Sequence, residues 1–298
     1  MASMTRRSFS TLAAAALCPV AGWPQGQEAA LLTRAIPSSG ERIPAVGLGT
    51  AIVFDNDDAK TREAATQILR TLLEQGGRLV DTASAYADAE LVLGHAMPAA
   101  ASRERFFVAT KLESPDAAEL ERSQTRLATR RLDLLQLHNV RDPAQSLARF
   151  REWKTQGVCR YVGITSTSRR AYEAVESVLR REKPDFVQID YSIDNREAEE
   201  RILPAAAEVG AGVLTALPFG RARLFRAVRG KPLPDWSTAF AQSWAQFFLK
   251  YLLGDERVTA VIPGTSDPAH MADNLGALRG RLPDAAERRR MVAFVQSL

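Results

Sequence analysis

The sequence contains little cysteine and no long apolar segment. Only two of its 298 residues are cysteine, Cys18 and Cys159, so the fold cannot depend on the disulfide framework that small secreted domains use. No stretch reaches the roughly 18 apolar residues that a membrane-spanning helix requires, which argues against stable insertion into a membrane. The 18 glycines and 15 prolines follow no triplet period, and this excludes a collagen-like chain.

Lysine and histidine are also scarce. Six of the 39 basic residues are lysine and the chain holds three histidines, so the formal net charge of +4 is carried mainly by arginine. The basic residues are scattered, and the longest run (residues 288–290) lies in a helix-like segment with an apolar face. Without a basic stripe interleaved with aromatic residues, we expect no nucleic-acid partner. No group of histidine, cysteine and carboxylate residues has metal-ligand spacing, so no metal is expected.

Residues 1–30 differ in composition from the rest of the chain. Residues 5–9 read Thr-Arg-Arg-Ser-Phe, a twin-arginine pattern, and an Ala-rich stretch over residues 9–20 precedes several Pro, Gly and Gln residues. This is the order of an export signal read by the twin-arginine machinery. We therefore expect a periplasmic or exported protein in which residues 1–30 form a signal peptide and disordered leader. The alternative is a disordered Ala-rich tail on a cytoplasmic enzyme.

Residues 31–298 are expected to form one domain in which strands and helices alternate. Its short aliphatic runs lack strict polar alternation, which is typical of strands buried on both faces of a parallel sheet. The strand candidates are residues 45–50, 78–82, 106–112, 132–138, 161–165, 186–191, 212–217 and 259–263. Helix-period segments separate them, and Asp116, Ser168 and Asp267 are expected as helix caps. These segments are residues 59–75, 87–97, 116–130, 146–156, 168–182, 197–209, 238–253 and 268–278.

Eight strand–helix units in about 250 residues favour an α/β fold of the (β/α)8 TIM-barrel type. A doubly wound open sheet is the competing architecture, but its phosphate-binding turn needs a third glycine that does not follow Gly47-Leu48-Gly49. Residues 31–43 predict a short N-terminal β-hairpin that turns at Ser39-Gly40 and plugs the bottom of the barrel. Residues 219–238 form the longest expected loop.

Polar residues at consecutive strand ends mark a candidate site, because the chemistry of such barrels lies at the carboxyl ends of the strands. Asp81, Lys111 and His138 end the second, third and fourth strand candidates, and Tyr86 follows Asp81 by five residues. A lone charge would be costly there, so Asp81 and Lys111 are expected to pair. A cation near Tyr86 favours the phenolate and makes the phenol a better proton donor, while His138 can donate a hydrogen bond to a carbonyl oxygen.

Each of these residues also has a purely structural explanation. Asp81 and Lys111 could form a plain buried ion pair, Tyr86 could be a rim aromatic, and His138 could be a core histidine. Their combination favours catalysis, because a phenol acid, a supporting lysine and an orienting histidine suit proton delivery to an oxygen that gains charge as a hydride arrives.

Several motifs along the chain occur together in one known family. They are residues 43–50, 81–86, 109–111, 137–138, 163–166, 187–192 and 262–266, the last followed by 273–275. Through them, residues 43 to about 278 resemble the aldo-keto reductase family. The resemblance implies the barrel, a nicotinamide cofactor, and a catalytic tetrad made of Asp81, Tyr86, Lys111 and His138.

The resemblance also implies cofactor contacts. It places the carboxamide of the nicotinamide against Thr165, Ser166 and Gln188. It places the adenosine phosphate against Pro263, Gly264, Thr265 and Asn274. The other expected contacts are Gly49, Thr50, Leu217, Phe219 and His270. The implied cofactor is NADPH, with NADH as an alternative.

Three places depart from the family pattern. Thr165-Ser166 stands where the family commonly has Ser-Asn, and Ser166 offers fewer hydrogen bonds than Asn. Ala216 stands where an aromatic residue usually stacks on the nicotinamide, so Phe219 is expected to substitute in part. Gly264 and His270 stand where many members place Lys and Arg on the 2′-phosphate, so these residues do not secure a preference for NADPH.

The leading hypothesis is an exported, monomeric, NAD(P)H-dependent oxidoreductase. It would reduce a small carbonyl compound, an aldehyde or a ketone, to an alcohol by hydride transfer, with Tyr86 as the general acid. The competing hypothesis is an exported nucleotide-binding sensor or partner protein with little turnover. Two considerations motivate it: an exported protein meets little free NAD(P)H, and Ala216 cannot stack on a nicotinamide.

Overall fold

Eight parallel strands form a closed barrel in the computed structural model, which describes residues 30–140 and 142–298. The strands are hydrogen-bonded in chain order, and bridges from Val46 to Val261 and from Gly49 to Gly264 join the last strand to the first. A Cβ atom on Gly49 would lie 2.7 Å from the carbonyl oxygen of Ile262, so glycine permits this close approach. The expected (β/α)8 barrel is confirmed. The strands are β3 (Leu48–Gly49), β4 (Leu79–Asp81), β5 (Phe107–Leu112), β6 (Leu132–His138), β7 (Cys159–Ser166), β8 (Phe186–Asp190), β9 (Gly212–Ala216) and β10 (Ala260–Val261).

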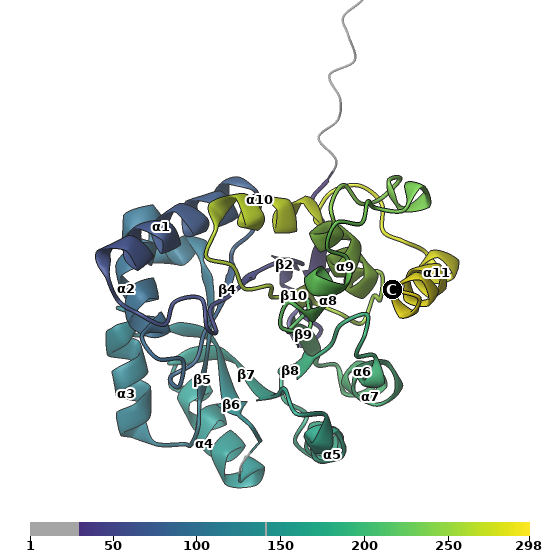
Figure 1. Ribbon diagram of the computed structural model, residues 1–298. Coiled ribbons are helices and arrows are strands. Elements are labelled where there is room, and N and C mark those ends of the chain that lie inside the picture. The colour runs from purple at the N-terminus through teal and green to yellow at the C-terminus, as the bar shows by residue number, and fades with distance from the viewer. Residues whose placement is uncertain (1–29, 141) are drawn as a thin grey trace, which may run out of the picture.

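Helices surround the central strands (Figure 1). Helix α1 packs against α2 and α10, and α10 packs against α9, so the last helix of the alternation meets the first. The helices are α1 (Ala59–Glu74), α2 (Ala89–Ala100), α3 (Ala117–Arg126), α4 (Pro143–Thr155), α5 (Tyr172–Glu182), α6 (Glu197–Glu200), α7 (Ile202–Val209), α8 (Arg223–Ala227), α9 (Trp244–Leu253), α10 (Pro268–Gly276) and α11 (Ala285–Gln296). Short 3-10 helices are η1 (Arg103–Arg105), η2 (Arg169–Ala171) and η3 (Asp235–Ser237).

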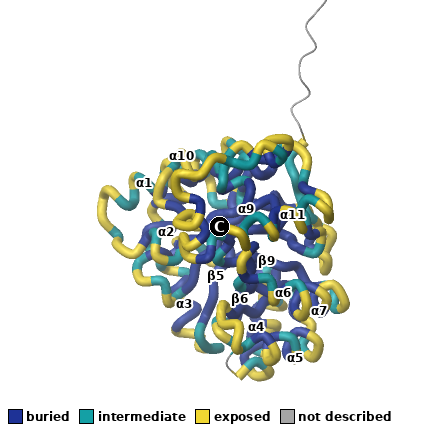
Figure 2. Tube along the Cα trace, turned by 45° about the vertical axis from the view of Figure 1, so that its right-hand side comes forward, coloured by how far each residue is buried: buried dark blue, intermediate teal, exposed yellow. Residues whose placement is uncertain are grey.

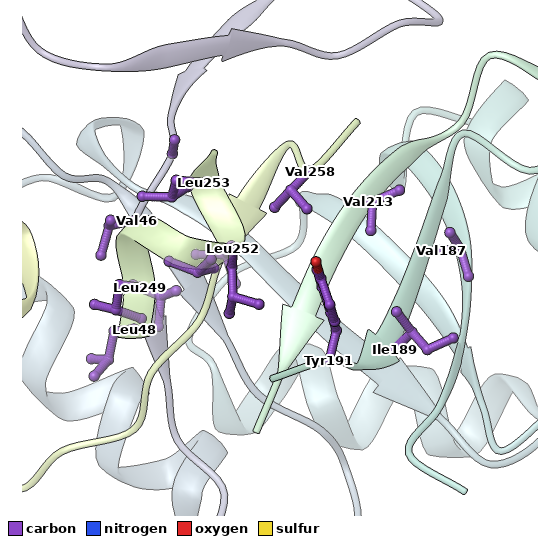
Figure 3. Close-up of a cluster of buried hydrophobic side chains, with 14 of the residues drawn as sticks. Val46, Leu48, Val187, Ile189, Tyr191, Val213, Leu249, Leu252, Leu253 and Val258 are labelled. Carbon is purple, nitrogen blue, oxygen red and sulfur yellow. The ribbon is translucent and has the colours of Figure 1, made fainter. Parts of the chain in front are cut away.

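Two sets of buried apolar side chains pack the described residues. The larger lies between the strands and the helices, and Figure 3 shows part of it, with Leu249, Leu252 and Leu253 of α9 beside Val46 and Leu48. The smaller lies inside the barrel. A single strand can contribute side chains to both sets, because successive side chains point to opposite faces of the sheet. Figure 2 accordingly shows the strands buried and the outer turns of the helices exposed.

The N-terminal hairpin closes the bottom of the barrel, as expected. Strands β1 (Thr33–Ala35) and β2 (Arg42–Pro44) pair antiparallel. Gly40 between them has φ +76°, in the left-handed region that glycine adopts readily. Ile36 and Ile43 are fully buried and belong to the set of apolar side chains inside the barrel.

A carboxylate of the hairpin binds the barrel wall. Glu41 accepts a hydrogen bond from the Tyr161 hydroxyl at 2.7 Å and forms ion pairs with Arg78 and Arg160. Burial raises the pKa of Glu41, but the hydrogen bonds from Tyr161 and Arg160 outweigh it and hold the pKa below its ordinary value. Glu41 is therefore ionised where it fastens the plug to the strands.

One of the expected helix caps is wrong. Asp116 and Asp267 do cap α3 and α10, because their carboxylates accept the N–H groups of Ala118 at 3.0 Å and Ala269 at 2.8 Å. Ser168 makes no capping hydrogen bond. Its own N–H donates to the hydroxyl of Ser166 at 3.2 Å, the chain continues as η2, and α5 begins only at Tyr172.

Several expected helices are shorter or divided. The segment 116–130, for example, is helical only as far as Arg126. The segment 197–209 is split into α6 and α7, because Pro204 has no N–H to donate to the carbonyl of Glu200. The segment 238–253 is helical only from Trp244, where Ser243 caps α9 by accepting the N–H of Gln246 at 3.1 Å. The expected long loop at 219–238 contains α8 and η3.

The expected twin-arginine signal and leader fall almost entirely within residues 1–29, outside the described residues. Among the residues that are described, none of the helices is long and apolar enough to cross a membrane.

Candidate active site

The charged residues at the ends of β4 and β5 form a buried pair, as expected. Nζ of Lys111 lies 2.6 Å from Oδ2 of Asp81 and donates a second hydrogen bond to the carbonyl oxygen of Thr82 at 2.7 Å. The two side chains are 1% and 3% exposed. Burial lowers the pKa of Lys111, but its interactions with Asp81 and Tyr86 outweigh burial and raise the pKa above its ordinary value. Lys111 is therefore a fixed cation.

The parallel register explains why residues from distant parts of the chain meet here. Lys111 is level with Gln136, His138 is level with Thr165, and Thr165 is level with Gln188. Because alternate residues of each strand face the barrel interior, neighbouring strands add polar side chains to the same inner layer at their carboxyl ends.

Two glutamines hold the other side of Asp81. Nε2 of Gln136 donates to Oδ1 of Asp81 at 3.3 Å and to Oε1 of Gln188 at 2.9 Å. Nε2 of Gln188 donates to Oδ2 of Asp81 at 3.2 Å. Sequence reasoning did not single out Gln136, although the signal was present: it is a polar residue in an apolar strand, two positions before His138 and so on the same face.

Tyr86 lies in the loop between β4 and α2 and places its ring beside this pair. Nζ of Lys111 is 4.9 Å from the ring centroid. The ring of His138 meets the ring of Tyr86 edge-on, with centroids 5.8 Å apart and an interplanar angle of 80°. Tyr86 is half-buried, so its ring packs against the site while part of it faces the solvent side. The sequence-based expectation of a cation near this phenol is met by Lys111.

His138 ends β6 and has a carboxylate neighbour. Its Nδ1 contacts an oxygen of Glu113, a residue that sequence reasoning did not identify. Burial lowers the pKa of His138 and the charge of Lys111 lowers it further, while Glu113 opposes both; the result lies below the ordinary histidine value. The imidazole is therefore mainly neutral at pH 7.

A cavity of about 730 Å³ lies over these groups. Most of the residues expected to form the site line it: Asp81, Tyr86, His138, Gly49, Thr50, Thr165, Gln188, Leu217, Phe219 and Gly264. Ala216 also lines it, at the position where a stacking aromatic was missing. The structure thus brings residues from seven separate segments of the chain to the lining of one cavity.

A second cavity, of about 390 Å³, adjoins the first and shares Phe219, Phe225 and Gly264 with it. Three more of the expected cofactor contacts line this cavity: Thr265, His270 and Asn274. Trp244 and Asp273 line it too. None of the described residues that line this cavity is lysine or arginine. Apart from His270, the ionisable side chain in this lining is the carboxylate of Asp273.

Three of the expected site residues line neither cavity. Lys111 lies behind the wall and reaches the site through Asp81 and the ring of Tyr86. Ser166 uses its hydroxyl to accept the N–H of Ser168 at 3.2 Å, and the carbonyl oxygen of Pro263 accepts the N–H of Gly49 at 3.0 Å. In this structure Ser166 and Pro263 therefore shape the rim of the barrel, and their direct contact with a cofactor stays a prediction.

Two exposed apolar residues at the larger cavity were also missed. Ile52 is 72% exposed and Phe225 is 37% exposed, and both line the cavity. Ile52 has φ +57°, which is rare for a β-branched residue. No sequence signal marks them, because the fold alone decides which apolar side chains stay outside the core.

Among residues 30–140 and 142–298, no group of three His, Cys, Asp or Glu side chains could hold a metal ion.

Comparison with known proteins shows the family. The model of the Aldo/keto reductase family matches residues 45–289. Methylglyoxal reductase YeaE of Escherichia coli is 28% identical over 255 residues, which cover 82% of this chain and 88% of that protein. An aldo-keto reductase of Mycolicibacterium smegmatis is 26% identical over 262 residues, covering 84% and 86%.

Solved structures show the same fold. The crystal structure of an aldo-keto reductase from Klebsiella pneumoniae in complex with NADPH superposes with a TM-score of 0.76 at 23% identity, covering 89% of this chain and 96% of that one. The holo form of an aldo-keto reductase from Bacillus halodurans superposes with a TM-score of 0.72 at 25% identity, with the same coverage. The protein described here is thus an oxidoreductase that belongs to the aldo/keto reductase family.

Proposed function

We propose that this protein reduces an aldehyde or a ketone to an alcohol, with NAD(P)H as the hydride source and Tyr86 as the general acid. One observation carries the proposal: the Tyr86 ring lies 4.9 Å from a buried ammonium group and edge-on to His138, on the wall of a single cavity. A proton donor, a fixed positive charge and a hydrogen-bonding imidazole thus converge on one space large enough for a small carbonyl compound.

The chemistry follows from these positions. When a carbonyl carbon receives a hydride, its oxygen becomes negative and must take up a proton, which the Tyr86 hydroxyl can supply. Lys111 stabilises the phenolate that remains, and it acts without rearrangement because Asp81 already fixes its ammonium group. Gln136 and Gln188 hold Asp81 in turn. The polar layer therefore orients the cation that assists the acid.

The two adjoining cavities fit a nicotinamide dinucleotide. Such a cofactor supplies the hydride when it is bound. Thr165 and Gln188 would hold the nicotinamide end, and the amide of Gln188 is already oriented by Gln136 and Asp81. At the other end, Thr265 and Asn274 are buried polar side chains on the wall of the second cavity, where Trp244 also offers a ring for stacking on adenine.

A turnover assay combined with a binding assay tests the proposal. NADPH and NADH are mixed with the purified protein and a panel of small aldehydes and ketones that includes methylglyoxal, the substrate in the name of one relative. Cofactor consumption supports the reductase. Quenching of tryptophan fluorescence by NADPH, lost in Trp244→Phe but without turnover of any carbonyl, supports the competing sensor. If the protein shows neither cofactor consumption nor quenching, both hypotheses are refuted.

The wall of the second cavity also predicts the cofactor preference. A charge-assisted hydrogen bond to phosphate is worth about 1.5–3 kcal/mol, and the described residues of that wall provide no lysine or arginine for the 2′-phosphate. We expect NADPH to bind less than about a hundredfold more tightly than NADH. Binding titrations with both cofactors check this; a preference above about a thousandfold would require a basic residue from elsewhere, such as Arg221.

We further propose export through the twin-arginine route, which rests only on residues 5–20 of the sequence. Replacing Arg6 and Arg7 by lysine should retain the protein in the cytoplasm, and replacing the neighbouring Thr5 by serine should not. Fractionation of cells that express each form measures this. Equal distribution of all forms would favour a cytoplasmic enzyme.

A further inference from the structure

Glu113 places a carboxylate against a buried ring nitrogen of His138. An oxygen of Glu113 contacts Nδ1, and this fully buried atom has no partner in full hydrogen-bond geometry among the described residues. A bare ring nitrogen and a carboxylate oxygen repel each other at contact distance, because both carry lone pairs. A proton on Nδ1 removes this repulsion and turns the contact into an attraction, so we infer that Nδ1 is the protonated nitrogen.

The position of Glu113 is built into the fold. The buried carboxylate of Glu119 on α3 accepts the backbone N–H of Glu113 at 3.0 Å and that of Ser114 at 3.3 Å. It also accepts the hydroxyl of Ser84 at 2.6 Å, in the loop that carries Tyr86. Glu119 thus fastens the segment after β5 to the segment after β4 and fixes the backbone of Glu113 beside His138.

This contact decides what the other ring nitrogen can do. A neutral imidazole has a single N–H, so with the proton on Nδ1 the remaining nitrogen, Nε2, can only accept a hydrogen bond. It can accept one from an alcohol but cannot donate one to a carbonyl oxygen. Only the protonated ring, with an N–H on both nitrogens, can bind a carbonyl through Nε2.

We propose that Glu113 is a positioning residue that makes carbonyl binding by His138 conditional on the protonation of that ring. The inference rests on the proposed reductase function and specifies its pH dependence: reduction should be favoured in acid, whereas neutral His138 suits the alcohol. Among the described residues, four groups face His138. Lys111 on β5 opposes its protonation, Asp81 on β4 and Glu113 favour it, and the edge-on ring of Tyr86 adjoins it. Glu113 is the acid in direct contact.

The variants Glu113→Gln and Glu113→Asp test the idea, with Glu121→Gln on the exposed face of α3 as the matched control. The first readout is the titration of the three histidines by NMR on the full chain, with His138→Gln assigning the signal of His138. We expect the titration of His138 to move to lower pH in Glu113→Gln and to return towards wild type in Glu113→Asp. Glu121→Gln should leave it in place.

The second readout is kcat/KM for carbonyl reduction against pH. In the wild type it should rise as the pH falls through the titration of His138. In Glu113→Gln this rise should begin at lower pH, leaving kcat/KM lower by about three- to tenfold at pH 6. In the His138→Gln background, adding Glu113→Gln should change kcat/KM by less than about twofold, because Glu113 then has no ring to act on.

The outcomes separate the inference from the proposed function. An unchanged His138 titration in Glu113→Gln, or an undiminished effect of that variant in the His138→Gln background, would overturn the role of Glu113. Absence of carbonyl turnover in the wild type would refute the reductase function and with it the catalytic part of the inference. The NMR titration would still establish whether Glu113 sets the charge of His138.

Discussion

The two ends of the barrel interior differ in the polarity of their side chains. At the bottom, Phe107 and Phe186 lie against Ile36 and Ile43 of the hairpin, and all four are buried and apolar. Near the top, the same strands β5 and β8 carry polar side chains. On β8 the change from Phe186 to Gln188 takes two residues.

This difference separates stability from chemistry within one layer of strands. The bottom removes apolar surface from water, at about 25 cal/mol per Å². The top holds a buried ion pair, whose Coulomb attraction is largely offset by the loss of hydration. Losses at the bottom should therefore lower stability, and losses at the top should act mainly on turnover unless they leave a buried charge without its partner.

The largest expected effect is on turnover at the top. Tyr86→Phe removes one hydroxyl from the lining of the cavity, and with it the proton that the proposed mechanism transfers. We expect kcat to fall by about a hundredfold or more, with a change in the free energy of unfolding below about 1 kcal/mol. Steady-state kinetics and urea denaturation measure the two. Turnover within about twofold of wild type would mean that another group, or water, protonates the product.

Lys111→Met should lower both turnover and stability. Activity should be lost, and Asp81 should be left buried without its cation, which costs on the order of 3–5 kcal/mol. Urea denaturation should therefore show this variant to be clearly less stable than Tyr86→Phe. The double variant Asp81→Asn, Lys111→Met is the control, since removing both charges should recover part of the stability. Equal stability of Lys111→Met and Tyr86→Phe would contradict a buried pair.

Matched isoleucine substitutions compare the two ends directly. Ile43→Ala at the buried bottom should destabilise the protein by about 2–5 kcal/mol and leave kcat within about twofold of wild type. Ile52→Ala, at the mouth of the cavity and 72% exposed, should change stability by less than about 0.5 kcal/mol and alter KM instead. Thermal unfolding and steady-state kinetics on both variants decide this. A reversed pattern would break the separation of the two ends.

The smallest expected effect concerns the hairpin carboxylate. The pKa of Glu41 is held below its ordinary value of 4.5, so its stabilising contribution is complete above that value and is lost as the pH falls through the folded-state pKa. Glu41→Gln should cost about 1 kcal/mol or less at pH 7, because these ion pairs are partly solvated. The free energies of unfolding of the wild type and Glu41→Gln, measured by denaturation, should converge as the pH is lowered from 7 to 3. A constant difference would show that the loss is not electrostatic.

The polar residues at the strand ends were easier to predict from the sequence than the side chains that contact them. Asp81, Lys111 and His138 were identified because charged or ionisable residues at the ends of apolar strands need a partner or a function. Gln136 was missed although its face could be deduced from the two-residue period of β6. Glu113 could not have been recognised, because only the turn fixed by Glu119 brings its carboxylate to the ring of His138.

Helix boundaries show the same limit. Glycine acts through its own backbone, so the turn at Gly40 could be anticipated locally, whereas the break before Pro204 was missed. The role of Ser168 could not be anticipated, because it depends on whether its side chain or its backbone N–H finds the nearer partner. In the structure the backbone N–H donates a hydrogen bond to the hydroxyl of Ser166. Competition between two local hydrogen bonds is decided by the geometry of the surrounding strands.

The sequence by itself determined the alternation of strands and helices, the closed barrel, the plug and which side chains are candidates for the site, because periodicity and the cost of burying charge act within a few residues. Tertiary structure alone decided which amides hold Asp81, which acid touches His138, and that Ile52 and Phe225 stay outside the core beside the cavity. Those contacts join residues up to 107 positions apart, as between Gln188 and Asp81. Their existence depends on the register of neighbouring strands, which no single segment encodes.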